Sequence, residues 1–589
     1  MTPEWLHPGL VLIMGAWILP FLKGGVKKVG MLAVPAAAMF LCYTMSEGTY
    51  GEVSFLGQDL VFGRVDRLSL IFSYVFSLMA LLGMVFALHV DDDTQHISAL
   101  GYAGGALGVT FAGDLLSLYV FWELMAVTSA LLVWLRREPE AERAAFRYFL
   151  VHVFGGLVLL AGILLYGHET GSYAFEHFGT SGGIAWGLIL TAFLLNAAVP
   201  PLGAWLPDAY PQASVTGAVF MTAFTTKSAV YVLIRGFAGT EFLIWLGAFM
   251  AIYGVVYAVL ENDARRLLAY HIISQVGYMV CGVGIGTALA INGATAHAFA
   301  HILYKALLFM GAGAVIQMTG KTKLTEMGGL YKTMPITLGL YMIGACAISA
   351  VPLFSGFVSK SMVVSAAAES HLQWIFLTLT LASAGTFLHT GLKLPYYMFF
   401  GKDTGLRAKE PPKNMLVAMG IAAALCVGVG VYPWWLYENL PHAAVALAYD
   451  VFSPSHLTST LGMLGFTALG FFMLLKHLDP KPTVSADTDW FYRRGTGLFV
   501  RVLKPLSRFE FGVVGQIYEF VIRKPVMAVA QHVRKIDGSV VDASFLGLAR
   551  GTESLSRLIR NGVSGHAQHY GLMMAIGALV LLVLAVLAL

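Results

Sequence analysis

The segment from Asn292 to Met318 reads NGATAHAFAHILYKALLFMGAGAVIQM, and Lys305 is its one residue of the Asp, Glu, Lys and Arg classes. Because an α-helix rises 1.5 Å per residue, about 20 apolar residues cross the roughly 30 Å hydrocarbon layer of a bilayer. The segment therefore predicts a membrane-spanning helix. A buried helix of a soluble protein is the alternative for one such stretch, but about fifteen similar stretches follow one another along this chain.

The composition of the whole chain leads to the same conclusion. Of 589 residues, 58% are hydrophobic and 12% are charged, against roughly 25% charged in an ordinary soluble domain. So few polar side chains cannot cover a water-facing surface, which excludes a soluble fold. We predict an all-α polytopic membrane protein with about 16 transmembrane helices. The predicted spans are 8–23, 28–46, 67–89, 97–112, 114–135, 144–167, 183–199, 212–237, 240–260, 266–287, 292–318, 334–352, 357–400 (broken, read as two elements), 414–432, 458–478 and 567–589.

The segment 487–566 has a different character and contains no long apolar window. From Trp490 to His566 it carries twelve Lys and Arg against five Asp and Glu, a net charge of +7, whereas the rest of the chain sums to −3. Because a hydrophobic helix follows at once, a membrane surface is a better partner for these charges than a nucleic acid. The alternatives are a lateral amphipathic helix and a cytoplasmic loop, and we favour the helix because apolar residues recur at helical spacing: Leu498, Val502, Leu506, Phe509 and Val513.

The orientation follows from the basic residues of the short loops. Up to the twelfth predicted helix, alternate loops contain twelve Lys and Arg, and the loops between them contain Arg64, Arg67 and Arg235 only. The positive-inside rule therefore places the N-terminus outside and the basic loops in the cytoplasm of a prokaryotic cell, with the chain in the inner (cytoplasmic) membrane. The first apolar segment lacks a basic leader, so we read it as a retained helix. The twelve are Lys23, Lys27, Lys28, Arg136, Arg137, Arg143, Arg147, Arg265, Arg266, Lys321, Lys323 and Lys332.

The four cysteines lie singly in apolar segments and form no Cys-x-x-Cys pair. We therefore expect no metal site and no cofactor in this chain, and any redox chemistry belongs to another chain.

Ionisable residues within the predicted helices are the informative ones, because each costs roughly 2.5–3.5 kcal/mol at the centre of a bilayer. Glu123 lies near the middle of its helix, and Lys227 lies in a helix whose one other charge, Arg235, is near its end. We expect these two to form an ion pair, with His152 as a second neighbour of Glu123. A purely structural ion pair is the alternative.

His297, His301 and Lys305 follow one another at intervals of four residues, which places them on one face of a helix over about 12 Å. A zinc site is disfavoured, because no Glu follows the first His and the lysine would repel a metal ion. Structural histidines are the second alternative. We favour a proton relay, because imidazole titrates near neutral pH and a desolvated lysine releases its proton readily.

Further charges lie beside helix-breaking residues. Lys360 follows Gly356, and His389 and Lys393 lie around Gly391 and just before a proline. Interrupted helices at membrane depth expose backbone groups that need water or protein partners, so the neighbourhood of Lys393 is predicted to be a hydrated site. A similar break is predicted at 199–202, where two prolines follow one another. For Lys360, a structural role and a functional role are equally favoured.

These motifs resemble the antiporter-like, proton-translocating subunits of respiratory complex I, a family shared with Mrp-type cation/proton antiporters and membrane-bound hydrogenases. The resemblance covers roughly residues 60–430. Its motifs are DLLSLYVFWE (114–123), WLPDA (205–209, including Asp208), DARRLLAY (263–270), SQVGY (274–278), HILYKALLF (301–309) and GFVSK (356–360).

The resemblance implies two inverted five-helix repeats, each with a broken helix, and two half-channels that meet on a hydrated axis. It implies that Glu123 is the ion-pair glutamate, Lys305 the central lysine and His297 and His301 the relay histidines, with Lys393 serving at the second broken helix. The tail resembles that of the largest complex I member, whose lateral helix runs along its neighbours. The implied divisions are 1–112 (N-terminal helices), 113–260 and 261–432 (repeats), 433–486 (additional helix and linker), 487–566 (lateral segment) and 567–589 (terminal helix).

One position departs from the pattern of the family. Many members have a lysine five residues before the second proline of the first break, and Asn196 stands there in this chain. Because an amide cannot carry the proton, Lys227 on the next helix must supply the partner of Glu123.

The leading functional hypothesis is a proton-translocating subunit that works with other integral-membrane subunits of a hetero-oligomeric complex. The proposed path uses Glu123, Lys227, the 297/301/305 set and Lys393, with His152, Asp208, Lys360 and His389 as accessory residues. The alternatives are the membrane subunit of an energy-coupled inorganic-carbon uptake complex and an Mrp-type Na⁺/H⁺ antiporter subunit. The buried basic residues favour H⁺ as the transported ion along the main path. Binding of Na⁺ near Glu123 or Asp208 is left as an open alternative.

Overall fold

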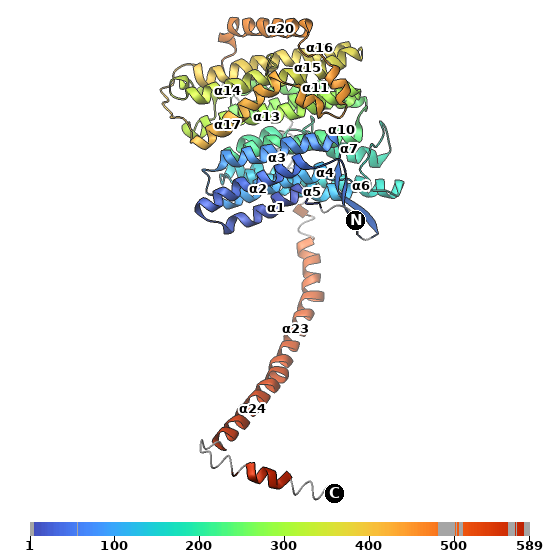
Figure 1. Ribbon diagram of the computed structural model, residues 1–589, viewed down its shortest axis with the longest axis vertical. Coiled ribbons are helices and arrows are strands. Elements are labelled where there is room, and N and C mark those ends of the chain that lie inside the picture. The colour runs from blue at the N-terminus through green and yellow to red at the C-terminus, as the bar shows by residue number, and fades with distance from the viewer. Residues whose placement is uncertain are drawn as a thin grey trace. The chain divides into compact units, whose positions relative to one another are not determined.

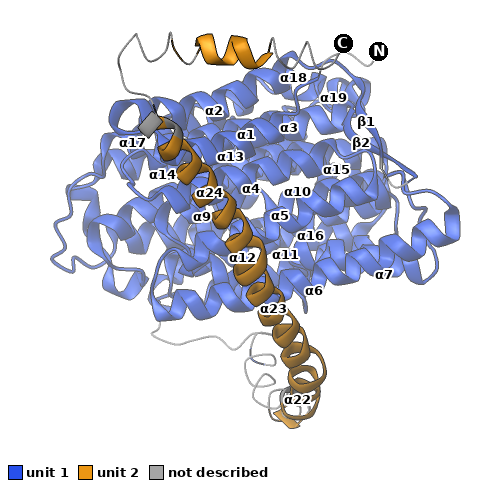
Figure 2. Cartoon of the chain, turned by 90° about the horizontal axis from the view of Figure 1, so that it is seen from below, with its two compact units in different colours: residues 1–490 blue, residues 491–589 orange. Residues whose placement is uncertain are grey.

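The computed structural model of the protein describes residues 5–55, 57–480, 490, 501, 504–505, 510–562, 572 and 574–581. The chain divides into two compact units, residues 1–490 and residues 491–589 (Figure 2). Each unit is described by itself below.

Unit 1 is a bundle of packed helices (Figure 1). Eleven helices in the described part of the chain are long and apolar enough to cross a membrane, and three shorter apolar helices accompany them. This confirms the all-α polytopic class. The helices are α1 (Pro8–Ile18), α2 (Gly24–Thr44), α3 (Arg67–Ala87), α4 (Asp93–Phe111), α5 (Leu115–Trp134), α6 (Pro139–Thr170), α7 (Ile184–Asn196), α8 (Trp205–Ala209), α9 (Val215–Ala223), α10 (Thr225–Phe237), α11 (Phe242–Leu260), α12 (Ala264–Ile285), α13 (Ala288–Thr319), α14 (Pro335–Ile348), α15 (Ser355–Glu369), α16 (Gln373–Thr386), the wider π-helical turns η5 (Phe387–Lys393) and η6 (Tyr396–Phe400), α17 (Lys413–Val431), α18 (Trp434–Glu438), α19 (Ala443–Ala448) and α20 (Pro454–Met473).

The predicted spans coincide with these helices to within a few residues up to 458–478. The span 357–400 is two elements, as predicted: α15, and a run from α16 through η6. The predicted span 212–237 is divided into α9 and α10 at Phe224.

A β-hairpin between α2 and α3 was not predicted. Strand β1 (Gly48–Phe55) pairs with β2 (Gln58–Val65) in an antiparallel two-stranded sheet. The backbone N–H of Val61 donates to the Asp114 carboxylate at 2.7 Å, which ties the hairpin to the start of α5. At its other end Asp66 caps α3 and accepts two hydrogen bonds from Arg235 of α10, at 2.8 and 2.9 Å.

Helix α13 forms the centre of unit 1. All residues of its most apolar 18-residue window are buried, and it packs against α3, α9, α12, α14, α15 and α17. Small residues allow this close packing: a side chain at Gly293 would collide with Val363 of α15, and one at Gly311 with Tyr341 of α14. The titratable residues of α13 therefore lie in the most enclosed part of the protein.

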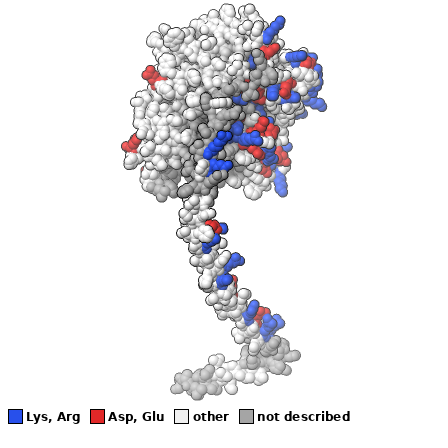
Figure 3. Space-filling model, turned by 180° about the vertical axis from the view of Figure 1, so that it is seen from behind, with Lys and Arg blue, Asp and Glu red and all other residues white. Residues whose placement is uncertain are grey.

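Most of the visible surface of unit 1 carries no charged side chains, and the charges gather along one side of it (Figure 3). Three of the loops predicted to share one membrane face are joined by ion pairs: Lys27 pairs with Asp93, and Arg137 pairs with Asp92 at 2.8 Å. Each exposed pair contributes only about 0–1 kcal/mol. Their value here is positional, because they place these loops together on the same face.

In unit 2 the described residues 510–562 are helical and exposed. They form η8 (Glu510–Val514), α22 (Gly515–Ile517), η9 (Tyr518–Arg523), α23 (Lys524–Ile536), η10 (Asp537–Val541) and α24 (Asp542–Gly562). Apolar residues recur every three or four positions, as in an amphipathic helix: Ile522, Val526, Val529, Val533, Ile536 and Val540. Four of the five apolar residues on which the lateral helix was predicted, Leu498, Val502, Leu506 and Phe509, lie outside the described residues, as does most of 567–589.

Candidate functional site

The α13 stripe, which consists of His297, His301 and Lys305, is fully buried. Nδ1 of His297 lies 3.1 Å from the Ser359 hydroxyl of α15, and its Nε2 lies 3.5 Å from the Tyr304 hydroxyl. Both ring nitrogens of His301 and Nζ of Lys305 have no hydrogen-bond partner among the described residues. The three side chains share one face, as their spacing predicts, and most of their polar atoms are free to bind water or exchange a proton.

A second polar stripe on α12 was missed by the sequence analysis. It consists of His271, Gln275 and Tyr278, all fully buried. The Gln275 amide accepts a hydrogen bond from the Tyr304 hydroxyl at 3.4 Å and donates to Thr386 of α16 at 3.3 Å. The signal that could have revealed this stripe is the spacing of four and three residues in an otherwise apolar helix.

Lys227 is fully buried just after the break between α9 and α10. Its Nζ donates to the backbone oxygen of Thr222 at 2.6 Å and to the Thr226 hydroxyl at 3.1 Å. The break at Phe224 makes this possible, because it frees a carbonyl that would otherwise belong to the helix ladder. Helix α10 packs against α13, and the charge of Lys227 acts on all three members of the α13 stripe.

Glu123 of α5 lies against Gly156 of α6. A side chain at Gly156 would overlap Oε1 of Glu123, so the glycine creates the space that the carboxylate occupies. Oε1 has no hydrogen-bond partner among the described residues, and no ion pair joins Glu123 to Lys227 there. The expected ion pair is therefore not formed in this structure, because Nζ of Lys227 is bound to Thr222 and Thr226 instead.

His152 lies one helical turn before Gly156 on the same face of α6. Its Nδ1 is 2.9 Å from the backbone oxygen of Tyr148, and its ring stacks on the Tyr148 ring with 4.0 Å between centroids. The Trp205 ring meets it edge-on at 4.6 Å. Nε2 has no partner among the described residues, which leaves one nitrogen of this accessory residue free.

The predicted break at 199–202 is present between α7 and α8. Ala198 has a left-handed backbone conformation with φ of 59°. The Trp205 indole donates to the oxygen of Leu195 at 2.9 Å, which also accepts from the N–H of Ala198 at 3.0 Å. Asn196 is buried at the end of α7, and its Oδ1 has no hydrogen-bond partner among the described residues. The residue that departs from the family pattern therefore stands at the interruption itself.

The second interruption lies at 349–354, between α14 and α15, and not at Lys393 as predicted. Ala350 has φ of 56°, which resembles that of Ala198. Lys360 follows this break and donates to the freed oxygen of Ile348 at 3.0 Å. Around Lys393 the chain widens into π-helical turns but continues as a helix. The reason is that π turns accommodate Gly391 and Pro395 without interrupting the helix.

Lys393 and His389 are buried in η5. Nζ of Lys393 donates to the backbone oxygen of Val259 at 2.7 Å, and the charge of Glu261 acts on it. Nδ1 of His389 has no partner among the described residues.

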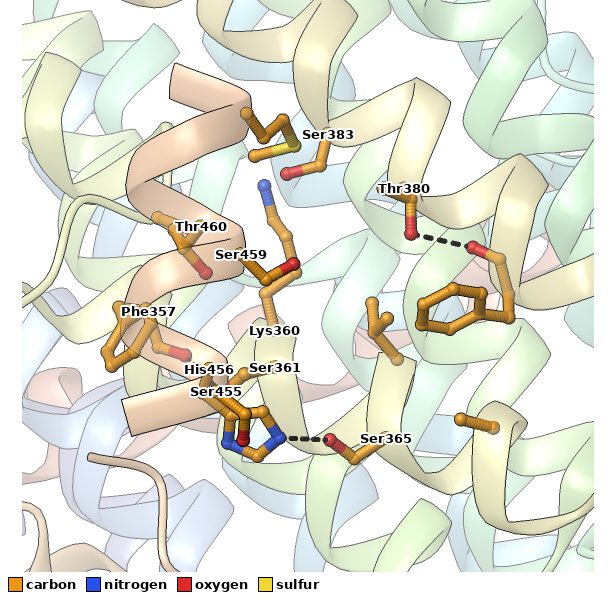
Figure 4. A pocket seen from close by; sticks show the side chains of 15 residues that line it. Phe357, Lys360, Ser361, Ser365, Thr380, Ser383, Ser455, His456, Ser459 and Thr460 are labelled. Carbon is orange, nitrogen blue, oxygen red and sulfur yellow. Dashed lines mark hydrogen bonds between the residues drawn. The ribbon is translucent and has the colours of Figure 1, made fainter. Parts of the chain in front are cut away.

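A cavity of about 300 Å³ lies between α15, α16 and α20 (Figure 4). At one end His456 of α20 is 3.3 Å from the Ser365 hydroxyl, and the Lys360 side chain reaches away from it toward Ser383. Seven of the fifteen residues that line the cavity carry hydroxyl groups: Ser361, Ser365, Thr380, Ser383, Ser455, Ser459 and Thr460. Such a lining suits water.

Asp208 has a different environment from the other accessory residues. Arg147 binds its carboxylate through two hydrogen bonds, at 2.7 and 2.8 Å. This bidentate pair fixes α6 against α8.

The chain is similar to several known membrane proteins. Residues 112–386 match the family described as NADH:quinone oxidoreductase/Mrp antiporter, transmembrane. The chain is 35% identical to one Na⁺/H⁺ antiporter subunit of Alkalihalophilus pseudofirmus over 350 residues, 55% of this chain and 70% of that protein. It is 29% identical over 484 residues to one subunit of the probable K⁺/H⁺ antiporter of Rhizobium meliloti, 75% of this chain and 48% of that protein. It is also 27% identical to the chloroplastic NAD(P)H-quinone oxidoreductase subunit 5 of Nephroselmis olivacea over 564 residues, 87% of this chain and 84% of that protein.

The fold itself resembles a chain of the Mrp complex from Dietzia. The TM-score is 0.63 at 22% identity, over 78% of this chain and 95% of that chain.

Proposed function

The chain belongs to the NADH:quinone oxidoreductase/Mrp antiporter family, and from this premise we propose that it moves protons through a chain of buried Glu, Lys and His residues. It is an antiporter-like subunit of the type found in Mrp and complex I-type membrane complexes. In the proposal, companion subunits supply the energy, and this chain supplies the path.

The observation that supports the path most strongly is the α13 stripe. Each ionisable residue at membrane depth costs roughly 2.5–3.5 kcal/mol, and a structural role would recover that cost through hydrogen bonds. His301 and Lys305 have no such bonds among the described residues. Groups that are buried, ionisable and free of partners are suited to passing protons through water.

The stripe has candidate neighbours at both ends. Lys227 acts on it from the first broken region, and Lys360 acts on both histidines from the second. Beyond Lys360 the hydroxyl-lined cavity leads to His456, which also borders a second hollow that includes Glu369 and Asp450. We infer that this route connects the stripe with the membrane face at which α15 ends.

The two interruptions support the proposed pair of inverted repeats, 113–260 and 261–432. Both follow a short apolar helix, α7 or α14, and both contain the sequence Ala-Val-Pro with its alanine at positive φ. In both, a backbone carbonyl beside the break accepts a side-chain hydrogen bond, from Trp205 in the first and Lys360 in the second. In the proposal each interruption lines one half-channel.

Glu123 is proposed to act as a switch. Its carboxylate has room beside Gly156 and a partner-free oxygen, so a cation that approaches it changes the balance of charge along the path. Because Asn196 cannot carry a proton, Lys227 is the proposed cation.

The positive-inside rule places the face of the basic loops in the cytoplasm, and the proposed location is the inner membrane of a prokaryotic cell. The proposed partners are other integral-membrane subunits. The segment 487–566 is proposed to lie along them.

Na⁺/H⁺ exchange is the second candidate function, and the 35% identity to a subunit of a Na⁺/H⁺ antiporter supports it. Flux measured with and without Na⁺ separates the two. A proton flux that requires Na⁺ on the opposite side of the membrane favours exchange.

The proposal is tested by proton flux in proteoliposomes that contain the purified complex. Lys305→Ala and Glu123→Ala should each abolish flux while the complex assembles. Lys409→Ala, at an exposed loop lysine, should leave flux unchanged. Normal flux in either buried-site variant would contradict the path.

A further inference from the structure

We propose that His271 of α12 is a proton-carrying residue that joins the α13 stripe to the basic residues of α15 and η5. This inference rests on the proposed function and extends it to a residue that the motifs do not single out. It follows from the environment of the side chain and from its position among the helices.

The environment of His271 is unlike that of a structural histidine. The side chain is fully buried, and neither ring nitrogen has a hydrogen-bond partner among the described residues. Two other buried histidines of the chain do use a ring nitrogen: Nε2 of His96 lies 3.0 Å from the oxygen of Val90, and Nδ1 of His7 accepts from the N–H of Gly9 at 2.9 Å.

An unbonded buried polar atom costs about 1–3 kcal/mol, so a histidine retained only for packing would be a poor choice at this position. An apolar side chain would fill the same space without that cost. Two free ring nitrogens are instead what a proton carrier needs, because one nitrogen accepts a proton while the other donates one.

The position of His271 makes it a junction. Helix α12 packs against α13, α15, α16 and η5. The charges that act on the His271 ring are those of Lys305 on α13, His389 on η5 and Lys360 on α15. Basic groups on three separate elements packed against α12 therefore act on this one imidazole.

The alternative links between these elements are weaker proton carriers. The Gln275 amide joins Tyr304 of α13 to Thr386 of α16, but an amide does not titrate at neutral pH. Ser359 reaches His297 through a hydroxyl, and a hydroxyl passes a proton only while it is bonded on both sides. Imidazole accepts and releases protons near neutral pH.

The proposed step changes N–H bonds only. A proton leaves the Lys305 ammonium and binds one ring nitrogen of His271, directly or through water. The imidazolium then releases a proton from its other nitrogen toward Lys360 or His389. The ring returns to its neutral form with its tautomer exchanged, and it is reset when it rotates or when its remaining proton moves back through water.

The test uses the purified complex in proteoliposomes, with proton entry driven by a K⁺ gradient and valinomycin and followed with a pH-sensitive dye. His271→Gln keeps the volume and polarity but cannot carry a proton. We expect flux to fall roughly tenfold or more, which corresponds to a barrier higher by about 1.4 kcal/mol. Ser274→Ala is the matched control, because Ser274 is equally buried on α12 but donates to Ala251 of α11 at 2.9 Å.

His271→Ala separates proton carrying from packing. Imidazole added to the buffer should restore part of the flux of this variant and none of the flux of Lys305→Ala, since a small base in the space left by the ring can replace a carrier. Wild-type flux in His271→Gln, or loss in His271→Ala that imidazole does not restore, would overturn the inference. If Lys305→Ala also retains flux, the proposed function fails as a whole; if only His271→Gln retains it, this inference alone fails.

Discussion

Replacement of Gly156 by alanine is the most informative perturbation of the site, because it changes only the space around Glu123. The added Cβ would overlap Oε1 of the Glu123 carboxylate. The carboxylate must therefore move, although Gly156 itself carries no charge and no hydrogen-bonding side chain.

The magnitude follows from two opposing effects. Alanine stabilises a helix interior by about 1 kcal/mol relative to glycine, whereas overpacking a close contact costs about 1–3 kcal/mol. The overlapped Oε1 is the far end of a flexible side chain, so the carboxylate moves aside. The gain in helix stability is the same wherever the carboxylate lies, so only the overpacking acts on its native position, and we take the middle of that range. The native position of the carboxylate is then disfavoured by about 2 kcal/mol, roughly a 30-fold change in its population.

The neighbouring residue provides a matched control. A Cβ on Gly155 would lie 3.2 Å from a terminal methyl of Leu195, a flexible group that moves easily. Gly155→Ala should therefore keep full proton flux in proteoliposomes, while Gly156→Ala should lose about tenfold or more and still assemble. Equal flux in the two variants would refute the assigned role of the carboxylate.

Three further predictions concern positions around the site. Asp208→Asn leaves Arg147 facing a neutral amide in place of a bidentate carboxylate at 2.7 and 2.8 Å, so we expect the free energy of unfolding to fall by about 2 kcal/mol. The melting temperature of the complex measures this loss, and an unchanged melting temperature would count against a stabilising role of the pair. Trp205→Phe removes the hydrogen bond to Leu195 across the first break, so the free energy of unfolding should fall by about 1 kcal/mol. Thermal inactivation measures this, and an inactivation half-life equal to that of the wild type would show that the bond contributes nothing. Lys360→Met should abolish proton flux with assembly retained, and flux at the wild-type rate would remove Lys360 from the path.

The helices could be predicted from the sequence because membrane-spanning segments must satisfy their backbone groups internally and must be apolar over a fixed length. The hairpin at 48–65 could not be predicted from apolar length. Its strands are short and outside the apolar windows, and its anchors, from Val61 to Asp114 and from Asp66 to Arg235, join residues distant in the sequence. Local patterns carry no information about such contacts.

The position of the second break was predicted wrongly from helix-breaking residues. Gly391 and Pro395 suggested an interruption near Lys393, but the chain absorbs both in π-helical turns. The interruption lies at 349–354 instead, where Pro352 follows Ala350 in the left-handed region. The repeated Ala-Val-Pro sequence was the available signal, and it identifies Lys360 as the residue beside the break.

The α13 stripe could be predicted because its three charges share one helix, so helical geometry alone places them together. The relation between Glu123 and Lys227 could not, because it depends on how two helices pack and on the space at Gly156. His271 was missed for the same reason: its neighbours come from three other elements.

The most direct test of the account is a cryo-EM map of the assembled complex at a resolution that shows ordered water. The account predicts bound water molecules that connect Lys227, the α13 stripe and Lys360 without interruption and fill the cavity up to His456. A map in which these side chains are separated by dry apolar packing would contradict it.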